Sequence, residues 1–157
     1  MAVHIVLYQP LIPANTGNIS RTCAGTGAYL HLIRPLGFST DDKQLKRAGL
    51  DYWEHVKLVY HDSLEDFYET ISGGECYYIT KFGEKAYSSF DFSDPEKDYY
   101  FIFGKETTGL PKEVIDANLD RCLRIPMNGH IRSLNLSNTA AILVYEALRQ
   151  QNFPDLM

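Results

Sequence analysis

Several short segments of this chain are apolar at nearly every position, instead of at every second one. The clearest is Tyr99–Phe103, which is aromatic or aliphatic throughout. Strands of this kind are buried on both faces, and they occur in parallel sheets that helices cover on both sides. The predicted strands are Val3–Tyr8, Tyr29–Ile33, Val56–Tyr60, Cys76–Thr80, Tyr99–Phe103 and Cys122–Ile125. We therefore predict an α/β fold, a three-layer α/β/α arrangement around a parallel sheet.

Helix signals lie between the predicted strands. Asn15 or Thr16 is expected to cap the first helix, and Ser63 opens a capping-box-like start. The predicted helices are about 15–25, Asp41–Gly49, 63–71, a short helix with Pro111 in its first turn, and about 137–151. The stretch Phe82–Asp98 is polar and is expected to be irregular, with one short helical turn. No repeat or linker interrupts the pattern, so we expect residues 1–157 to form one domain.

Composition excludes several classes of protein. The hydrophobic fraction of 45% and charged fraction of 22% are those of a folded chain. No apolar run approaches the roughly 20 residues of a membrane span, and the N-terminus leads directly into a strand instead of a signal peptide. Cys23, Cys76 and Cys122 are scattered, without metal-site spacing. We expect a cytoplasmic protein with small apolar cysteines and no metal.

Charge gives a weaker indication of the partner. The net charge of −5 argues mildly against nucleic acid, because phosphate binding depends on Lys and Arg. Lys43, Lys46 and Arg47 nevertheless form a basic cluster that could contact RNA phosphates. The same pattern is typical of a solvated helix face.

Three polar or glycine-containing loops lie in the last third of the chain. Gly104–Gly109 follows the strand Tyr99–Phe103, Pro126 ends the strand Cys122–Ile125, and Arg132–Asn138 precedes the terminal helix. Each loop alone could be an ordinary turn or helix cap. Open α/β sheets bind ligands beyond the carboxyl ends of their strands, so the three together predict a ligand crevice.

Familiar nucleotide-binding and hydrolase signatures are absent from the sequence. Gly104 and Gly109 have the glycine spacing of a P-loop, but Leu110 and Pro111 stand where Lys and Ser or Thr are needed. There is no dinucleotide fingerprint and no Gly-x-Ser-x-Gly elbow. The histidines are isolated in sequence, and we interpret each as structural or surface: His4, His31, His55, His61 and His130.

A crevice with few titratable groups suits a ligand that carries its own electrophile. S-adenosylmethionine has a reactive sulfonium, so methyl transfer mainly requires positioning. Ile79, Gly104, Ile125 and Leu134 stand at or just after strand ends and could line an adenine slot. The missing side chain of Gly104 would let backbone approach the ligand closely.

Four segments of the chain resemble the SPOUT RNA methyltransferases: NTGNISR, FGKETTGLP, RIPM and RSLNLSNTAAILVYEA. Within the TrmH-like class, the chain is most similar to the TrmL-type (YibK-type) tRNA ribose 2′-O-methyltransferases, and the resemblance covers essentially the whole chain. It implies a C-terminal trefoil knot around S-adenosylmethionine, which leaves as S-adenosylhomocysteine. The cofactor contacts that it implies are Ile79, Gly104, Ile125 and Ser133. The family's polar positions match Asn15, Arg21, Glu106, Ser133 and Asn135.

The resemblance also implies a substrate. It would be the 2′-hydroxyl of the wobble nucleotide of tRNA, a cytidine or modified uridine, with leucine tRNAs as the expected targets. One alternative is a ribosomal RNA ribose methyltransferase of the same superfamily, although such relatives usually carry an added RNA-binding domain. The other is a non-catalytic, flavodoxin-like nucleotide- or RNA-binding module, which would not need Arg21, Glu106 and Asn135 together.

Arg21 has two possible roles in such an enzyme. The family is often credited with an arginine that acts as a base, but a guanidinium stays protonated in proteins. We interpret Arg21 as a bidentate clamp on the phosphate beside the target ribose. The sequence leaves the choice between base and clamp open.

The terminal helix is apolar over much of its circumference. Ala140, Val144 and Ala147 belong to a stripe that is wide enough to cover the sheet, and Ala141, Ile142 and Tyr145 extend the apolar surface beyond it. We predict a homodimer with Tyr145 in its interface, in which Arg21 of one subunit approaches the pocket of the other. The alternative is that Tyr145 packs inside its own subunit.

Overall fold

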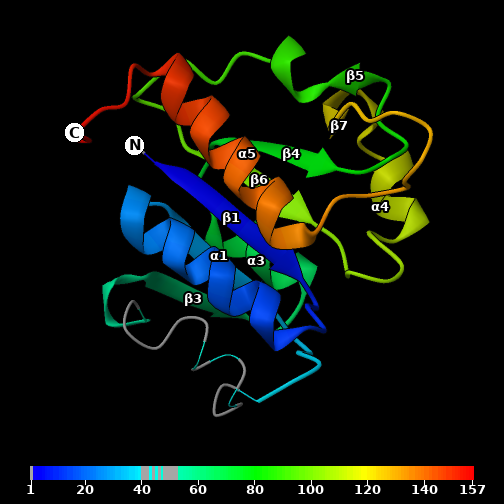
Figure 1. Cartoon of the computed structure of the whole chain (residues 1–157), viewed down its shortest axis with the longest axis horizontal. Coiled ribbons are helices and arrows are strands. Elements are labelled where there is room, and N and C mark those ends of the chain that lie inside the picture. The colour runs from blue at the N-terminus through cyan, green and yellow to red at the C-terminus, as the bar shows by residue number, and fades with distance from the viewer. Residues whose placement is uncertain (1, 40–42, 44, 46, 48–52) are drawn as a thin grey trace.

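A single sheet runs through the computed structural model, which describes residues 2–39, 43, 45, 47 and 53–157. The sheet has seven strands in the order β3-β2-β1-β6-β4-β7-β5, and every neighbouring pair is parallel. The strands are β1 Val3–Tyr8, β2 Tyr29–Ile33, β3 Lys57–His61, β4 Glu75–Ile79, β5 Lys85–Ala86, β6 Tyr99–Phe103 and β7 Cys122–Arg124. The predicted parallel α/β sheet is confirmed (Figure 1). The trefoil knot stays a prediction.

Helices cover both faces of this sheet (Figure 1). They are α1 Pro13–Thr26, α3 Leu64–Thr70, α4 Lys112–Asp116 and α5 Leu136–Gln150, with 3-10 turns at Trp53–His55, Tyr87–Ser89 and Leu119–Arg121. α1 and α5 pack against each other on one face. None of the described helices is long and apolar enough to span a membrane. Of the predicted helix Asp41–Gly49, only residues 43, 45 and 47 are described, and they are helical.

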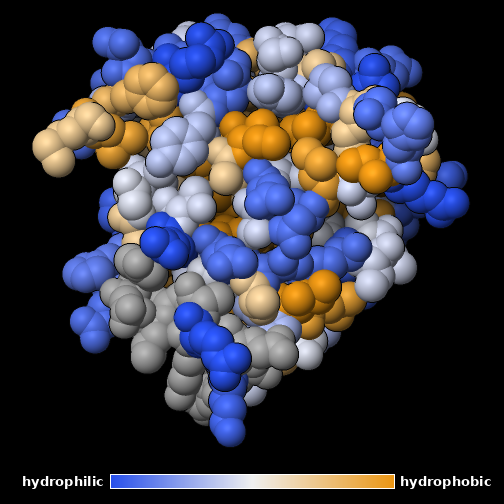
Figure 2. Space-filling view, in the orientation of Figure 1, coloured by the Kyte–Doolittle hydropathy of each residue, from blue (hydrophilic) through white to orange (hydrophobic). Residues whose placement is uncertain are grey.

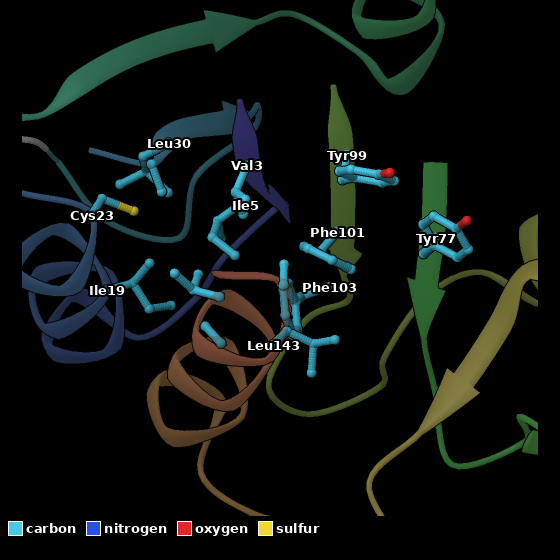
Figure 3. Close-up of a cluster of buried hydrophobic side chains, with 14 of the residues drawn as sticks. Val3, Ile5, Ile19, Cys23, Leu30, Tyr77, Tyr99, Phe101, Phe103 and Leu143 are labelled. Carbon is cyan, nitrogen blue, oxygen red and sulfur yellow. The ribbon is translucent and has the colours of Figure 1, made fainter. Parts of the chain in front are cut away.

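Consecutive strand residues enter two separate cores, which explains why the strands are apolar throughout. Ile5, Phe101 and Phe103 point toward α1 and α5, where they meet Ile19 and Leu143 (Figure 3). Their strand neighbours pack on the opposite face with side chains of α3 and α4: Val6, Tyr100 and Ile102 with Leu64, Phe67 and Ile115. A strand residue of either parity is therefore removed from water.

Two local predictions were wrong. α1 begins at Pro13, with Ile12 at the N-cap position and no side-chain cap, whereas Asn15 and Thr16 are buried inside the helix. Proline suits a first helical position because its missing N–H would have no partner there. The stretch Phe82–Asp98 also contains the strand β5, which pairs with β7 and is only two residues long. A strand of that length has no periodicity to detect.

Three histidines that are far apart in the sequence form one buried hydrogen-bonded chain on the α3 face. His4 Nδ1 lies 2.9 Å from His31 Nε2, and His31 Nδ1 lies 2.8 Å from His61 Nε2. At one end His4 Nε2 lies 3.1 Å from a carboxylate oxygen of Asp98. These histidines are isolated in the sequence, and parallel strand pairing brings them together because it places β1, β2 and β3 side by side. With Asp98 ionised, each neutral ring donates through Nε2 toward the carboxylate.

Because these three histidines are buried, the protein should become less stable in mild acid. Desolvation lowers the pKa of His4 and His61 from the ordinary value of 6.5, and it lowers the pKa of His31 to about 3. The unfolded chain then binds protons that the folded chain rejects, so the free energy of unfolding decreases as the pH falls below about 6.5. His31 alone should contribute a loss of about 2 kcal/mol by about pH 5.

Urea unfolding at a series of pH values measures this loss. His31→Gln should flatten the dependence, whereas the exposed His130→Gln should leave it unchanged. A wild-type free energy of unfolding that is constant from about pH 7 to about pH 5 would contradict the proposed effect of the chain.

Candidate functional site at the carboxyl edge of the sheet

A cavity of about 540 Å³ opens at the carboxyl ends of β4, β6 and β7. Parallel strands bring these ends to one edge, and the loop before α5 closes the cavity. The predicted cofactor residues all line it: Ile79, Gly104, Ile125, Ser133 and Leu134. Asn15, Glu106 and Asn135 line it too. The structure therefore brings eight of the predicted site residues together, from segments at both ends of the chain.

The carboxylate of Glu106 is bound to the N-terminus of α1. Leu11 N donates to Glu106 Oε1 at 2.9 Å, and Ile12 N donates to Oε2 at 2.8 Å. These amides precede the first turn of α1, where backbone N–H groups have no partner within the helix and where the helix dipole favours a negative charge. Glu106 therefore binds the backbone N–H of the N-cap residue from a distant loop, as the glutamate of a capping box does from within its own helix.

Asn15 and Asn135 continue this contact as a chain of side-chain hydrogen bonds. Asn15 Nδ2 donates to Glu106 Oε2 at 3.3 Å, and Asn135 Nδ2 donates to Asn15 Oδ1 at 3.1 Å. Asn135 Oδ1 in turn accepts from the backbone N of Ser137 at 2.9 Å, which caps α5. The starts of the two helices and the loop after β6 are thus joined by one continuous polar network.

The fold gives a reason for a glycine at position 104 that does not depend on a ligand. A Cβ at Gly104 would lie 2.1 Å from the carbonyl carbon of Gly109 and 2.2 Å from Leu110 N. The loop folds back on itself there, with hydrogen bonds in both directions between Lys105 and Gly109. Glycine is therefore required by the loop's own backbone, and a valine at position 104 would disturb the loop before any ligand was involved.

Arg21 does not line the cavity. It lies on α1, and its side chain is exposed, whereas Asn15, Ile19 and Cys23 of the same helix are buried. Arg21 is therefore not among the residues that line the cavity together with Glu106 and Asn135. Among the predicted RNA-binding residues Lys43 and Arg47 are exposed, and Lys46 lies outside the described part of the chain.

Several lining residues were missed by sequence reasoning. They are mainly Thr80, Lys81, Phe82, Lys105, Met127 and Thr139. Thr80 ends the predicted strand Cys76–Thr80, and Lys81 and Phe82 directly follow it, so their position at a strand end was the available signal. They went unnoticed because the stretch after that strand is polar and has no regular pattern.

The chemistry of the cavity is that of a binding site with little acid–base capacity. Glu106 is the one carboxylate among its lining residues, and that group is occupied by backbone amides of Leu11 and Ile12. None of the described residues that line it is a His or a Cys. Within the described part of the chain, no cluster of three or more His, Cys, Asp or Glu could hold a metal ion. Ile79, Ile125 and Leu134 provide apolar walls for an organic ligand.

Known proteins with similar sequences include several that are RNA methyltransferases by name. A relative from Listeria monocytogenes serotype 4b is 74% identical over 157 residues, which is 100% of this chain and 93% of the relative. Its name provisionally assigns it as a tRNA (cytidine(34)-2'-O)-methyltransferase. The tRNA (cytidine(34)-2'-O)-methyltransferase of Escherichia coli K12 is 45% identical over 153 residues, covering 97% of this chain and 96% of the relative.

Solved structures agree with these sequence relations. A protein solved for insight into the 2-OH methylation of C/U34 on tRNA matches with a TM-score of 0.89 and 46% identity, over 96% of this chain and 97% of that one. A SpoU methyltransferase from Streptomyces viridochromogenes, solved in complex with AdoMet, matches with a TM-score of 0.80 and 25% identity, over 96% and 61%. The sequence family described as the SpoU rRNA Methylase family matches residues 2–145. Because this match spans most of the chain, the protein belongs to the SpoU methylase family.

Proposed function

We propose that the protein transfers a methyl group from S-adenosylmethionine to the ribose 2′-hydroxyl of the wobble nucleotide of tRNA. The observation that carries the proposal is the Glu106–Asn15–Asn135 network, which joins three distant segments at the mouth of a cavity with apolar walls. The names of the 45% to 74% identical relatives support cytidine 34 as the target. We also propose that a modified uridine at position 34 can be the target, and that leucine tRNAs are the substrates.

The cavity fits the cofactor in size and chemistry. Its volume of about 540 Å³ lies within the usual range for small-molecule sites. Ile79, Ile125 and Leu134 would hold the adenine, and backbone groups of the loop after β6 would supply polar contacts. S-adenosylmethionine itself supplies the electrophilic methyl group. The protein therefore has to bind and orient the cofactor and the substrate, and to exclude water from them. The residue that would clamp the phosphate beside the target ribose lies outside this cavity.

That residue is Arg21, in our proposal, and it acts on the pocket of a partner subunit. Arg21 is exposed and outside its own cavity, so a twofold arrangement would complete the site. α5 offers a surface for this contact: Ala141 and Ile142 are only partly buried, and Tyr145 is 49% exposed. Figure 2 shows hydrophobic side chains among polar ones on the face that carries α1 and α5.

Tyr145→Glu should convert the proposed dimer into monomers. A charge on the apolar face of α5 would have to be buried in the interface without a partner, which is strongly unfavourable. Because Tyr145 is half exposed in the single subunit, the variant should still fold. Sedimentation velocity measures the change, and methyl transfer should fall with it.

Leu119→Glu is the matched control, since Leu119 is 58% exposed and lies on the 3-10 turn before β7. This variant should sediment as the wild type does. A wild-type protein that is monomeric at the concentrations used for the activity measurement would refute the dimer.

The reaction itself is tested with labelled S-adenosylmethionine and total tRNA, followed by mapping of the methylated nucleotide. Label at the 2′-position of nucleotide 34 is the expected result. Label in ribosomal RNA and none in tRNA would favour the ribosomal alternative. Binding of tRNA without any transfer would favour a non-catalytic module.

The remaining parts of the proposal follow from the same family. Residues 1–157 would act as one methyltransferase domain in the cytoplasm, with the knot around the cofactor. Lys43, Lys46 and Arg47 would add phosphate contacts.

A further inference from the structure

Phe82 is the most exposed large hydrophobic side chain in the described part of the chain, apart from the terminal Met157. Its exposed fraction is 63%, although it stands between β4 and β5 and close to the sheet. Phe82 lines the cavity at the carboxyl edge and also a second cavity of about 600 Å³ beside it. The two cavities share Lys105 and Leu110 as well, so Phe82 stands where they adjoin.

The backbone that carries Phe82 is firmly held, although its ring is exposed. Thr80 N donates to Leu123 O at 3.0 Å, and Gly83 N donates to Thr80 O at 3.2 Å. Phe82 N donates to Thr80 Oγ1 at 3.2 Å. Gly83 is buried against β7, where a Cβ would come within 2.7 Å of the Leu123 carbonyl carbon. The turn therefore presents an aromatic ring to solvent from a preorganised backbone.

One cation lies beside this ring, and three others line the same cavity. Lys81 Nζ lies 5.2 Å from the centroid of the Phe82 ring, and Lys105, Arg124 and Arg132 line the same cavity. In the described part of the chain, no ion pair involves any of these four side chains. The chain as a whole carries a net charge of −5, so this concentration of positive charge is local.

The cofactor does not account for these cations. S-adenosylmethionine carries one carboxylate, which one of these side chains could bind, but its sulfonium and ammonium groups are positive and repel the others. A polyanion does account for them, because each phosphate of an RNA strand can be neutralised by one Lys or Arg. An exposed aromatic ring among such cations is typical of proteins that bind single-stranded nucleic acid, in which bases stack on the ring.

We propose that Phe82 stacks on an unpaired nucleobase of the tRNA loop beside the methylated nucleotide, while Lys81, Lys105, Arg124 and Arg132 bind the flanking phosphates. This assignment rests on the proposed function and names the part of the site that holds the RNA. It also explains why a phenylalanine occupies an exposed turn that the fold does not need.

Substitutions at Phe82 separate stacking from apolar contact. Phe82→Ala and Phe82→Leu should each weaken the binding of an anticodon stem-loop RNA by about ten-fold, because stacking contributes about 1–3 kcal/mol per base. Phe82→Trp should restore the affinity, and in a Trp53→Phe background its fluorescence should be quenched when the RNA binds. Phe153→Ala is the matched control, because Phe153 is 42% exposed and lies outside both cavities.

A charge test complements the stacking test. Arg124→Gln combined with Arg132→Gln should lower the slope of log affinity against log salt by about two relative to wild type. Because these residues also line the cofactor cavity, calorimetric affinity for S-adenosylhomocysteine is measured in parallel, and it should fall much less than the affinity for RNA. RNA affinity that Phe82→Ala leaves at the wild-type value would overturn the proposal, and so would a selective loss of cofactor affinity.

The same measurements distinguish this inference from the proposed function. A wild type that methylates nucleotide 34 while its Phe82 variants bind RNA normally refutes only the stacking role. A wild type that neither binds nor methylates tRNA refutes both.

Discussion

Replacing Arg21 by alanine should lower methyl transfer to tRNA by about two to three orders of magnitude, whereas the affinity for S-adenosylmethionine stays within about two-fold. Arg21 lies outside the cavity that would hold the cofactor, so its removal leaves those contacts in place. It is exposed on α1, so stability should change little. Single-turnover methylation and calorimetry measure the two effects separately.

Arg21→Lys and the pH dependence distinguish a clamp from a base. A lysine keeps the charge but cannot form the bidentate contact, so a clamp predicts partial activity and a rate that does not follow the titration of residue 21. A base predicts that Arg21→Lys shifts the pH profile toward lower pH, because a lysine loses its proton more readily. Near-native turnover of Arg21→Ala would remove Arg21 from the reaction altogether.

Mixed dimers test whether the site is shared between subunits. Ser133→Trp should block the cavity from an exposed loop position and be inactive alone. Coexpressed with Arg21→Ala, it should restore activity, because the heterodimer contains one pocket of normal structure that faces a normal Arg21. If a proven heterodimer showed no methyl transfer, Arg21 and the pocket on which it acts would belong to the same subunit.

Glu106→Gln should lower the free energy of unfolding by about 1–3 kcal/mol, the usual effect of losing charged hydrogen bonds to buried or partly buried groups. A glutamine keeps one acceptor oxygen, but its amide nitrogen would face the N–H of Ile12 or the amide of Asn15. Two donors would then oppose each other at the start of α1. Methyl transfer should fall as well, because α1 carries Arg21.

Hydrogen exchange locates the origin of that loss. The amides of Leu11 and Ile12 should exchange faster in Glu106→Gln than in wild type, since they donate to the carboxylate. Glu96→Gln is the control, because Glu96 is exposed and lies in the turn before β6. Unchanged protection of Leu11 and Ile12 would contradict the anchoring role of Glu106.

The sequence by itself determined the sheet and the edge at which ligands bind. Strands such as Tyr99–Phe103 are apolar at both parities, and only a sheet with two covered faces buries both. Because all strands of a parallel sheet end at one edge, the loops after them had to converge. Ile79, Gly104 and Ile125 were therefore predictable as neighbours before their distances were known.

The tertiary structure alone decided which side chains and backbone groups contact each other within this sheet and at its carboxyl edge. Leu11 and Glu106 are 95 positions apart, and His4 and Asp98 are 94 apart, so no local pattern relates them. The clash that requires Gly104 is likewise set by how its loop closes on Gly109. Local sequence determines backbone preference and burial, whereas hydrogen bonds between distant segments depend on strand order and register, which arise only when the whole sheet packs.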